Sequence, residues 1–212
     1  MRHKFTLSIF SLWLVVIANA QNVGIGTATP LARLHVTDSS VLFSAAGDIP
    51  ATPHPPPISG AGRRLMWYPD KAAFRVGYTY STEWDSVNIG AYSIAMGYNT
   101  VSSGNYTTAM GLGVTASGTY STAMGYATKA SGNFSTTIGA YTTASGSNST
   151  AMGYGATASG GSSTAMGSKT NASGNYATAM GDFTRFSSGC VQSHDTLHFF
   201  FIVFSFRRGC YL

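Results

Sequence analysis

The sequence predicts an all-β protein whose main part is a parallel β-roll, a solenoid of 14-residue coils. The first observation is a strict period: seven three-residue phrases, six of them Ala-Met-Gly, recur in one register between Ala95 and Gly181. The second is a pair of glycines seven residues apart in each repeat, separated by runs rich in Thr, Ser, Ala and Tyr. A short period without insertions is typical of one structural unit stacked on copies of itself.

Each repeat is expected to contain two short strands and two turns. In the repeat at residues 126–139, the glycines Gly132 and Gly139 bound the runs that we expect to form strands. Glycine supplies the positive φ that tight turns demand, so both glycine positions are expected at turns. The expected turn glycines are Gly97, Gly104, Gly111, Gly118, Gly125, Gly132, Gly139, Gly146, Gly153, Gly160, Gly167, Gly174 and Gly181.

Stacking places each strand about 4.8 Å from its copy in the next coil, so six full coils form a rod of roughly 29 Å. Side chains alternate between the two faces of a strand. Thr136 and Ile138 therefore share one face, and small residues lie on the opposite face. This alternation predicts a threonine ladder beside a column of Met and Ile. The ladder comprises Thr108, Thr122, Thr136, Thr150, Thr164 and Thr178, and the second column runs from Met110 to Met180.

A coil of two short strands with small side chains between them is too thin to enclose a large core. Small folding units generally need further burial or cross-links to be stable. The missing burial is most simply gained by joining other copies, so we expect an oligomer whose rolls share an axial core. Neither composition nor spacing sets the number of copies.

The first twenty residues have the features of a secretory signal peptide. A basic start precedes the apolar run Phe5–Ile17, and the small residues Ala18 and Ala20 stand before Gln21. The apolar run is too short for a membrane-spanning helix, which needs about 20 residues. We expect cleavage before Gln21 and export to the cell surface, the outer membrane or the extracellular space.

Residues 21–87 form an N-terminal segment without the repeat. A proline-rich loop in its middle, from Pro50 to Pro57, suits neither a helix nor a central strand. Alternating and β-branched runs on either side predict short strands, the last two around a turn at Pro69-Asp70. The predicted strands lie within residues 22–27 and at Leu34–Val36, Val41–Phe43, Leu65–Tyr68 and Ala73–Tyr78.

The repeat array spans residues 88–181, and a tail at 182–212 departs from it. The first half-repeat of the tail reaches its Ser-Gly turn one residue late, and an aromatic-rich run follows. Two explanations stay open: a truncated or frame-shifted tail, or a genuine capping segment. Export would permit a disulfide between Cys190 and Cys210, although their spacing does not by itself predict one.

Charged residues are scarce, at 9% of the chain against about 25% in an ordinary soluble domain. Within residues 98–181 the only charged side chains are Lys129 and Lys169. A nucleic-acid binder needs a clustered basic face, so nucleic acid is not an expected partner.

No catalytic or metal site is predicted. The seven acidic residues are scattered along the chain and offer no visible pair for hydrolysis. His35 and His54 occur in a strand and in the proline loop, where structural histidines outnumber metal ligands. Gly24-x-Gly26 lacks the third glycine and the following helix of a dinucleotide-binding loop, so it indicates a turn. We therefore expect no enzyme and no cofactor.

The repeat ending Ala-Ser-Gly-x-x-Ser-Thr-Ala-Met-Gly resembles the head repeat of trimeric autotransporter adhesins, the YadA-like or haemagglutinin-type repeat. The resemblance covers residues 88–181 and implies a left-handed parallel β-roll, three chains side by side and a bacterial outer surface. The opening, Val23 to Thr27 followed by Leu34–Val36, is similar to the start of bacterial tail-fibre-like surface proteins. The chaperone domain that ends those proteins and the β-barrel anchor of autotransporters are not recognised in this sequence.

These observations favour a surface-exposed, homotrimeric structural and adhesive rod whose ligand is a host or environmental glycan or matrix protein. A recurring aromatic column is the candidate contact surface, although the same rings are equally suited to packing between chains. One alternative is an ice- or crystal-binding solenoid that uses the threonine ladder, and another is a glycan-degrading tail-fibre enzyme. The candidate contact residues are Tyr106, Tyr120, Phe134 and Tyr176.

Overall fold

The computed structural model describes residues 23–187 and 191–194. The predicted signal cleavage site at Ala18, Ala20 and Gln21 lies outside these residues, and so do Cys190 and Cys210. The chain divides into two compact units, Met1–Ser44 and Ala45–Leu212, and each is described by itself. The described parts contain strands and two short 3-10 helices but no α-helix, so the predicted all-β class is confirmed.

The first unit contains a small parallel pair of strands, β1 (Val23–Ile25) and β2 (Leu34–Val36), as predicted. The pair is extended by hydrogen bonds from the Val23 N–H to the Arg33 carbonyl (2.6 Å) and from the Thr37 N–H to the Ile25 carbonyl (2.9 Å). The third strand predicted here, Val41–Phe43, is wrong. These residues form no strand in the described structure, and their apolar side chains are exposed.

The second unit begins with the proline-rich loop and an antiparallel hairpin, in which β3 (Gly62–Tyr68) pairs with β4 (Ala73–Thr79). A 3-10 helix, η1 (Pro69–Lys71), forms the connection, which confirms the predicted strands and turn. The loop is fastened to this turn through one carboxylate oxygen. Asp70 Oδ2 accepts hydrogen bonds from the His54 backbone N–H (2.8 Å) and lies 2.7 Å from His54 Nδ1.

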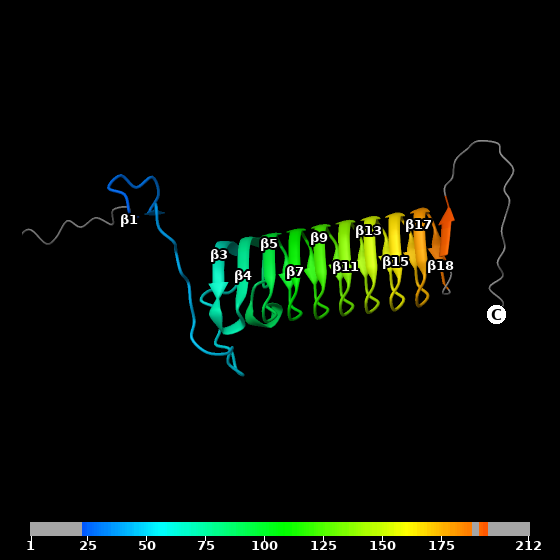
Figure 1. Ribbon diagram of the computed structural model, residues 1–212, viewed down its shortest axis with the longest axis horizontal. Coiled ribbons are helices and arrows are strands. Elements are labelled where there is room, and N and C mark those ends of the chain that lie inside the picture. The colour runs from blue at the N-terminus through cyan, green and yellow to red at the C-terminus, as the bar shows by residue number, and fades with distance from the viewer. Residues whose placement is uncertain (1–22, 188–190, 195–212) are drawn as a thin grey trace, which may run out of the picture. The chain divides into compact units, whose positions relative to one another are not determined.

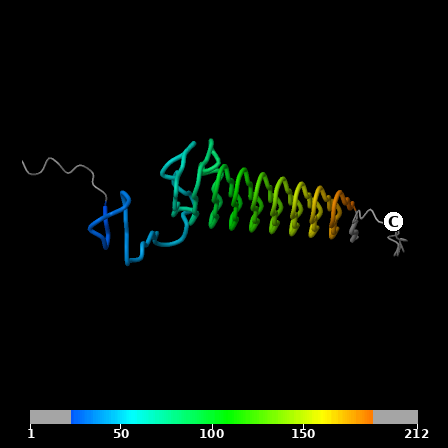
Figure 2. The backbone as a smooth tube through the Cα atoms, turned by 90° about the horizontal axis from the view of Figure 1, so that it is seen from above, coloured from blue at the N-terminus to red at the C-terminus, as the bar shows by residue number. Residues whose placement is uncertain are grey.

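The rest of the unit is a roll of coils, each containing one five-residue strand and one two-residue strand. The coils follow one another in chain order along a row (Figure 1), and each is a flattened loop (Figure 2). The long strands are β5 (Ile94–Tyr98), β7 (Thr108–Leu112), β9 (Thr122–Tyr126), β11 (Thr136–Ala140), β13 (Thr150–Tyr154), β15 (Thr164–Ser168) and β17 (Thr178–Asp182). The short strands are β6 (Val101–Ser102), β8 (Thr115–Ala116), β10 (Lys129–Ala130), β12 (Thr143–Ala144), β14 (Thr157–Ala158), β16 (Asn171–Ala172) and β18 (Arg185–Phe186).

Long strands pair with long strands and short with short, always in parallel and always with the residue fourteen positions away. The period of the sequence is therefore the length of one coil. The hairpin joins the long sheet because β4 pairs in parallel with β5, so the ten-stranded sheet runs from β3 to β19 (Val191–His194). In the last coil Thr178 pairs with Val191, a spacing of thirteen residues, although β18 still pairs with β16 in the fourteen-residue register.

The interior between the two sheets is made of small side chains in columns. Alanines at the second position of the long strands and of the short strands are completely buried, as Ala123 and Ala130 illustrate. Buried serines complete the filling, and Ser149 Oγ donates a hydrogen bond to the Gly146 carbonyl three residues earlier (2.6 Å). The predicted alternation is confirmed: Ser135 and Thr137 point inward, whereas the Thr and Met columns point outward.

Both glycine columns were expected to lie in turns, but the two columns have different structural roles. The column that includes Gly125 lies inside the long strands and not in turns, although its φ of 120° is positive as expected. The column that includes Gly118 begins a turn but has no positive φ. What both share is close approach: a Cβ at either would lie 2.0 Å from the carbonyl oxygen of the equivalent glycine in the next coil. The stacking of coils, more than turn geometry, thus requires glycine at both positions.

The N-terminal end of the roll is closed by large buried side chains. Arg75 occupies the inward position in register with Ala95, and its guanidinium donates hydrogen bonds to Ser93 O (2.9 Å), Ser93 Oγ (2.8 Å) and Ser102 O (3.1 Å). Burial lowers the pKa of Arg75 to about 10. Trp84 is also fully buried and donates from its indole Nε1 to the Thr100 carbonyl (2.9 Å). These side chains cover the alanine and serine columns, which have no further coil on this side.

Replacing Gly125 with alanine should lower the free energy of unfolding by about 3 kcal/mol, because the new Cβ collides with the Gly139 carbonyl. Gly113→Ala is the matched control. Its φ is also positive, at 63°, but the nearest atom to an added Cβ is 4.0 Å away. This control should cost about 1 kcal/mol. Urea unfolding curves of the two variants measure the difference, and equal losses would contradict the close-approach explanation.

Candidate interaction surface

The outer face of the long sheet carries two parallel columns of side chains. The threonine column, from Thr108 to Thr178, lies beside the column from Met110 to Met180, and each residue pairs in register with its copy. Most of these side chains are half-buried in the single chain, and Ile138 is 39% exposed. An apolar stripe therefore follows the whole length of the roll. The second column is methionine, not threonine, which disagrees with the two-column array expected of an ice-binding solenoid.

Four aromatic rings form a continuous stack along one edge of the roll. The ring centroids of Tyr92 and Tyr106 are 4.9 Å apart, those of Tyr106 and Tyr120 4.7 Å, and those of Tyr120 and Phe134 4.9 Å. Neighbouring planes are inclined by 10° or less. These spacings match the distance between adjacent strands, so the backbone ladder sets the ring stack.

Each stacked ring stands on a residue with left-handed backbone conformation, as the φ of 58° at Tyr120 illustrates. The equivalent positions in the following coils are Asn148 and Ser162, which end the stack, and then Tyr176. Tyr176 is 75% exposed, compared with 49% for Tyr120, because no ring lies in the coil before it. The structure thus brings together three of the four predicted contact residues and leaves Tyr176 apart.

The opposite edge carries a second aromatic group, Tyr126, Tyr141 and Tyr154. Their rings meet edge to face, with centroids 5.0 Å and 5.7 Å apart. The hydrogen bond with the Tyr126 side chain raises the pKa of the Tyr141 phenol above its usual value. Tyr141 was not anticipated because it falls one position after the Tyr126 and Tyr154 column, where Ala140 leaves space for its ring.

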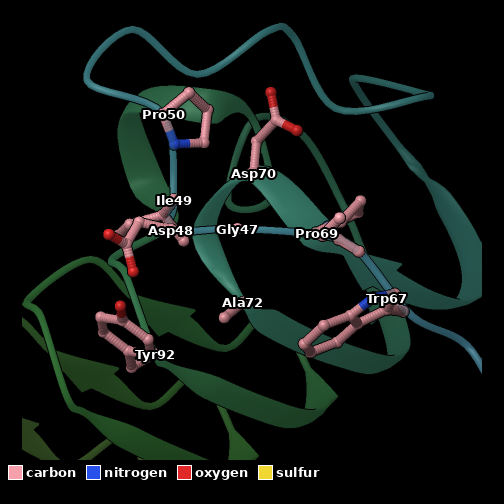
Figure 3. A pocket seen from close by; sticks show the side chains of 11 residues that line it. Gly47, Asp48, Ile49, Pro50, Trp67, Pro69, Asp70, Ala72 and Tyr92 are labelled. Atoms are coloured by element: carbon pink, nitrogen blue, oxygen red, sulfur yellow. The ribbon is translucent and has the colours of Figure 1, made fainter.

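A hollow of about 210 Å³ lies beside the η1 turn, between the segment at residues 45–50 and Trp67. Figure 3 shows Trp67 and Tyr92 on either side of Ala72, while the Asp48 and Asp70 side chains point in different directions. Hydrogen bonding to the His54 backbone holds the pKa of Asp70 below its usual range. The two carboxylates do not converge on a common point, so the hollow lacks the arrangement of a hydrolytic site.

The titratable side chains of the described residues have structural partners or stand singly. His35 Nδ1 accepts a hydrogen bond from the Leu31 N–H (3.2 Å), and His54 is paired with Asp70. Within residues 23–187 and 191–194, no three His, Cys, Asp or Glu side chains gather closely enough to hold a metal ion. No helix in the described part has the length and hydropathy needed to cross a membrane.

Comparison with known families identifies the coils. Residues 89–113, 116–142, 138–156, 144–169 and 158–184 match the family described as YadA head domain repeat (2 copies). Residues 89–184 therefore resemble YadA head repeats. The YadA head family is one of structural adhesin domains and not an enzyme family, its head domains form trimers, and YadA-like adhesins are surface-exposed. Among curated proteins, none matches this chain.

Placing the repeats on the roll also shows which functional candidates the repeat pattern missed. Tyr92 belongs to the ring stack, yet it precedes the first full YadA-like repeat. Its position fourteen residues before Tyr106 was a usable signal. Tyr141 carried no such signal, because only the folded turn brings its ring between those of its neighbours.

Replacing Tyr120 with serine should lower the free energy of unfolding by about 2 kcal/mol, because two ring contacts are lost. Serine suits this backbone position, since Ser162 adopts the same left-handed conformation three coils further along the same column. Tyr176→Ser, outside the stack, should change stability by less than about 0.5 kcal/mol. Thermal unfolding followed by near-ultraviolet circular dichroism measures both variants. An equal effect of the two would show that the stack adds nothing to the fold.

Proposed function

We propose that the mature chain is an exported, surface-exposed adhesive rod in which three copies pack their rolls around a shared axis. The outward methionine column is the observation that carries this proposal. It is an apolar stripe on a roll whose own interior columns are mainly alanine, serine and threonine. Side chains as large as methionine belong in a core, and the single chain provides no second layer to cover them.

The number three rests on the family, whose head domains form trimers. Three flattened rolls with their long sheets facing one axis would bury the Met and Thr columns together. The threonine hydroxyls would then lie beside the axial core, and the short sheets would face the solvent. Such an assembly supplies the burial that a coil of two short strands lacks.

The aromatic column supports an adhesive role for the outer edge of such a rod. Tyr106, Tyr120 and Phe134 are each about half exposed, and their ring edges form a regular array that contains no charged residue. Regularly spaced aromatic rings with hydroxyl-rich neighbours suit contact with a glycan or a matrix protein. Tyr176 belongs to the same column, separated from Phe134 by the two coils that carry Asn148 and Ser162. The predicted signal peptide and the resemblance of the opening to tail-fibre-like proteins support presentation at a bacterial surface.

The mature chain, beginning at Gln21, should have three times the mass of one copy in light scattering on a sizing column. Met124→Asp should weaken this assembly by at least about tenfold, because it places a charge at the apolar axis. The control is Thr115→Asp, which introduces the same charge on the outer face of the short strand β8. A monomeric parent chain, or equal weakening by both variants, would contradict assembly through the methionine column.

The triple variant Tyr106→Ser, Tyr120→Ser, Phe134→Ser should lose adhesion to arrays of immobilised glycans and matrix proteins by at least about tenfold. The control removes two rings from the opposite edge, Tyr126→Ser and Tyr154→Ser. Both proteins are compared as assemblies of verified mass. If the triple variant adheres as well as the parent chain, the aromatic stack is not the contact surface.

A further inference from the structure

The outward face of the long sheet changes its character at the hairpin end. The column that is threonine in every full repeat continues through Ile94 and Phe74 to Trp67. The methionine column continues in register through Met96 and Val76 to Leu65. Both outward columns are thus apolar over the three strands β3, β4 and β5. We call this surface the cap patch, and its residues are Leu65, Trp67, Phe74, Val76, Ile94 and Met96.

Two side chains of the cap patch are exposed in the single chain, and the other four are half-buried. Leu65 is 69% exposed and Ile94 is 41% exposed. The inward residues of the same strands, such as Met66 and Arg75, are by contrast almost completely buried, so the patch is not part of the roll's own core. It is also uncharged, with Arg63 at its border.

The repeats themselves leave the alignment of neighbouring copies undetermined. Successive coils present the same outward pair, Thr followed by Met, with Ile138 as the single departure in the full repeats. Sliding one copy by a whole coil against its neighbours would therefore replace methionine by methionine and threonine by threonine. Register is weakly specified wherever a surface repeats itself in this way.

We propose that the cap patch is a contact between copies of this chain and that it sets their register along the rod. This proposal rests on the proposed trimer and adds a residue-level function to the non-repetitive hairpin. Its occupant is the cap patch of a second copy. The patch continues the methionine column in register, so copies that share that column as an axis bring their patches together. The aligned arrangement covers all three apolar strands with their own copies. A one-coil slip leaves Leu65 and Trp67 of one copy without a facing strand and places Ile94 and Met96 of the other against the Thr108 and Met110 columns.

Disulfide trapping tests the register directly in the mature chain with Cys190 and Cys210 replaced by serine. Met152→Cys copies should cross-link to one another in high yield when the rods are aligned. Adding Leu65→Ser and Ile94→Ser should lower this yield by about threefold at unchanged trimer mass. When Met152→Cys copies are mixed with Met166→Cys copies, a disulfide between the two positions reports a slip of one coil. The Leu65→Ser and Ile94→Ser substitutions should increase the yield of this disulfide. The control is Val87→Ser, in the 3-10 helix η2 (Ser86–Asn88), which removes an 84% exposed apolar side chain outside the patch.

Tryptophan fluorescence provides a second readout without substitution. Of the two tryptophans in the mature chain, Trp84 is fully buried. Iodide therefore quenches only the fluorescence of Trp67. Quenching should fall on assembly if patches meet. Unchanged quenching in the trimer, or a Leu65→Ser, Ile94→Ser variant as well aligned as the control, would overturn the register role while leaving the trimer intact. A parent chain that is monomeric and forms no cross-links would overturn the trimer as well.

Discussion

The backbone of each coil lies directly against the backbone of the next at two glycine columns, and this contact determines the rest of the roll. A Cβ at Gly118 or Gly125 would stand 2.0 Å from a carbonyl oxygen of the following coil. With glycine there, the strands reach the hydrogen-bonding distance of a parallel sheet along both faces. Every coil then repeats the geometry of its neighbour, so identical side chains are stacked at the spacing of the strands.

Stacking arranges the side chains in columns, and a column's role depends on whether it points into the roll or outward. Inward columns hold alanine, serine and threonine because two sheets this close leave room for little else. Serine also satisfies a carbonyl of the turn, as the bond from Ser149 to Gly146 illustrates. Larger side chains must point outward, where methionine forms the apolar stripe and Tyr120 joins the ring stack. The narrow interior and the apolar and aromatic columns of the exterior therefore have the same origin.

A stack of identical units needs a different structure at its end. Arg75 replaces alanine at the inward position of β4, next to the first coil, and its guanidinium donates hydrogen bonds to the Ser93 and Ser102 carbonyls. Trp84 closes the same end with its whole side chain buried. The outward side of the hairpin carries Trp67 and Leu65 in line with the repeat columns. One hairpin thus closes the core and distinguishes this end from every other coil.

The sequence by itself determined the coil length, the parallel stacking, the inward and outward sides of each strand and the hairpin around Pro69, because each depends on periodicity or on local turn chemistry. Only the tertiary structure decided what depends on contacts between coils. It placed Gly125 inside a strand, left Val41–Phe43 without a partner strand, and inserted the Tyr141 ring beside Tyr126. Local patterns report how a residue sits in its own coil. They do not report how closely the next coil approaches or which ring fills the space that Ala140 leaves.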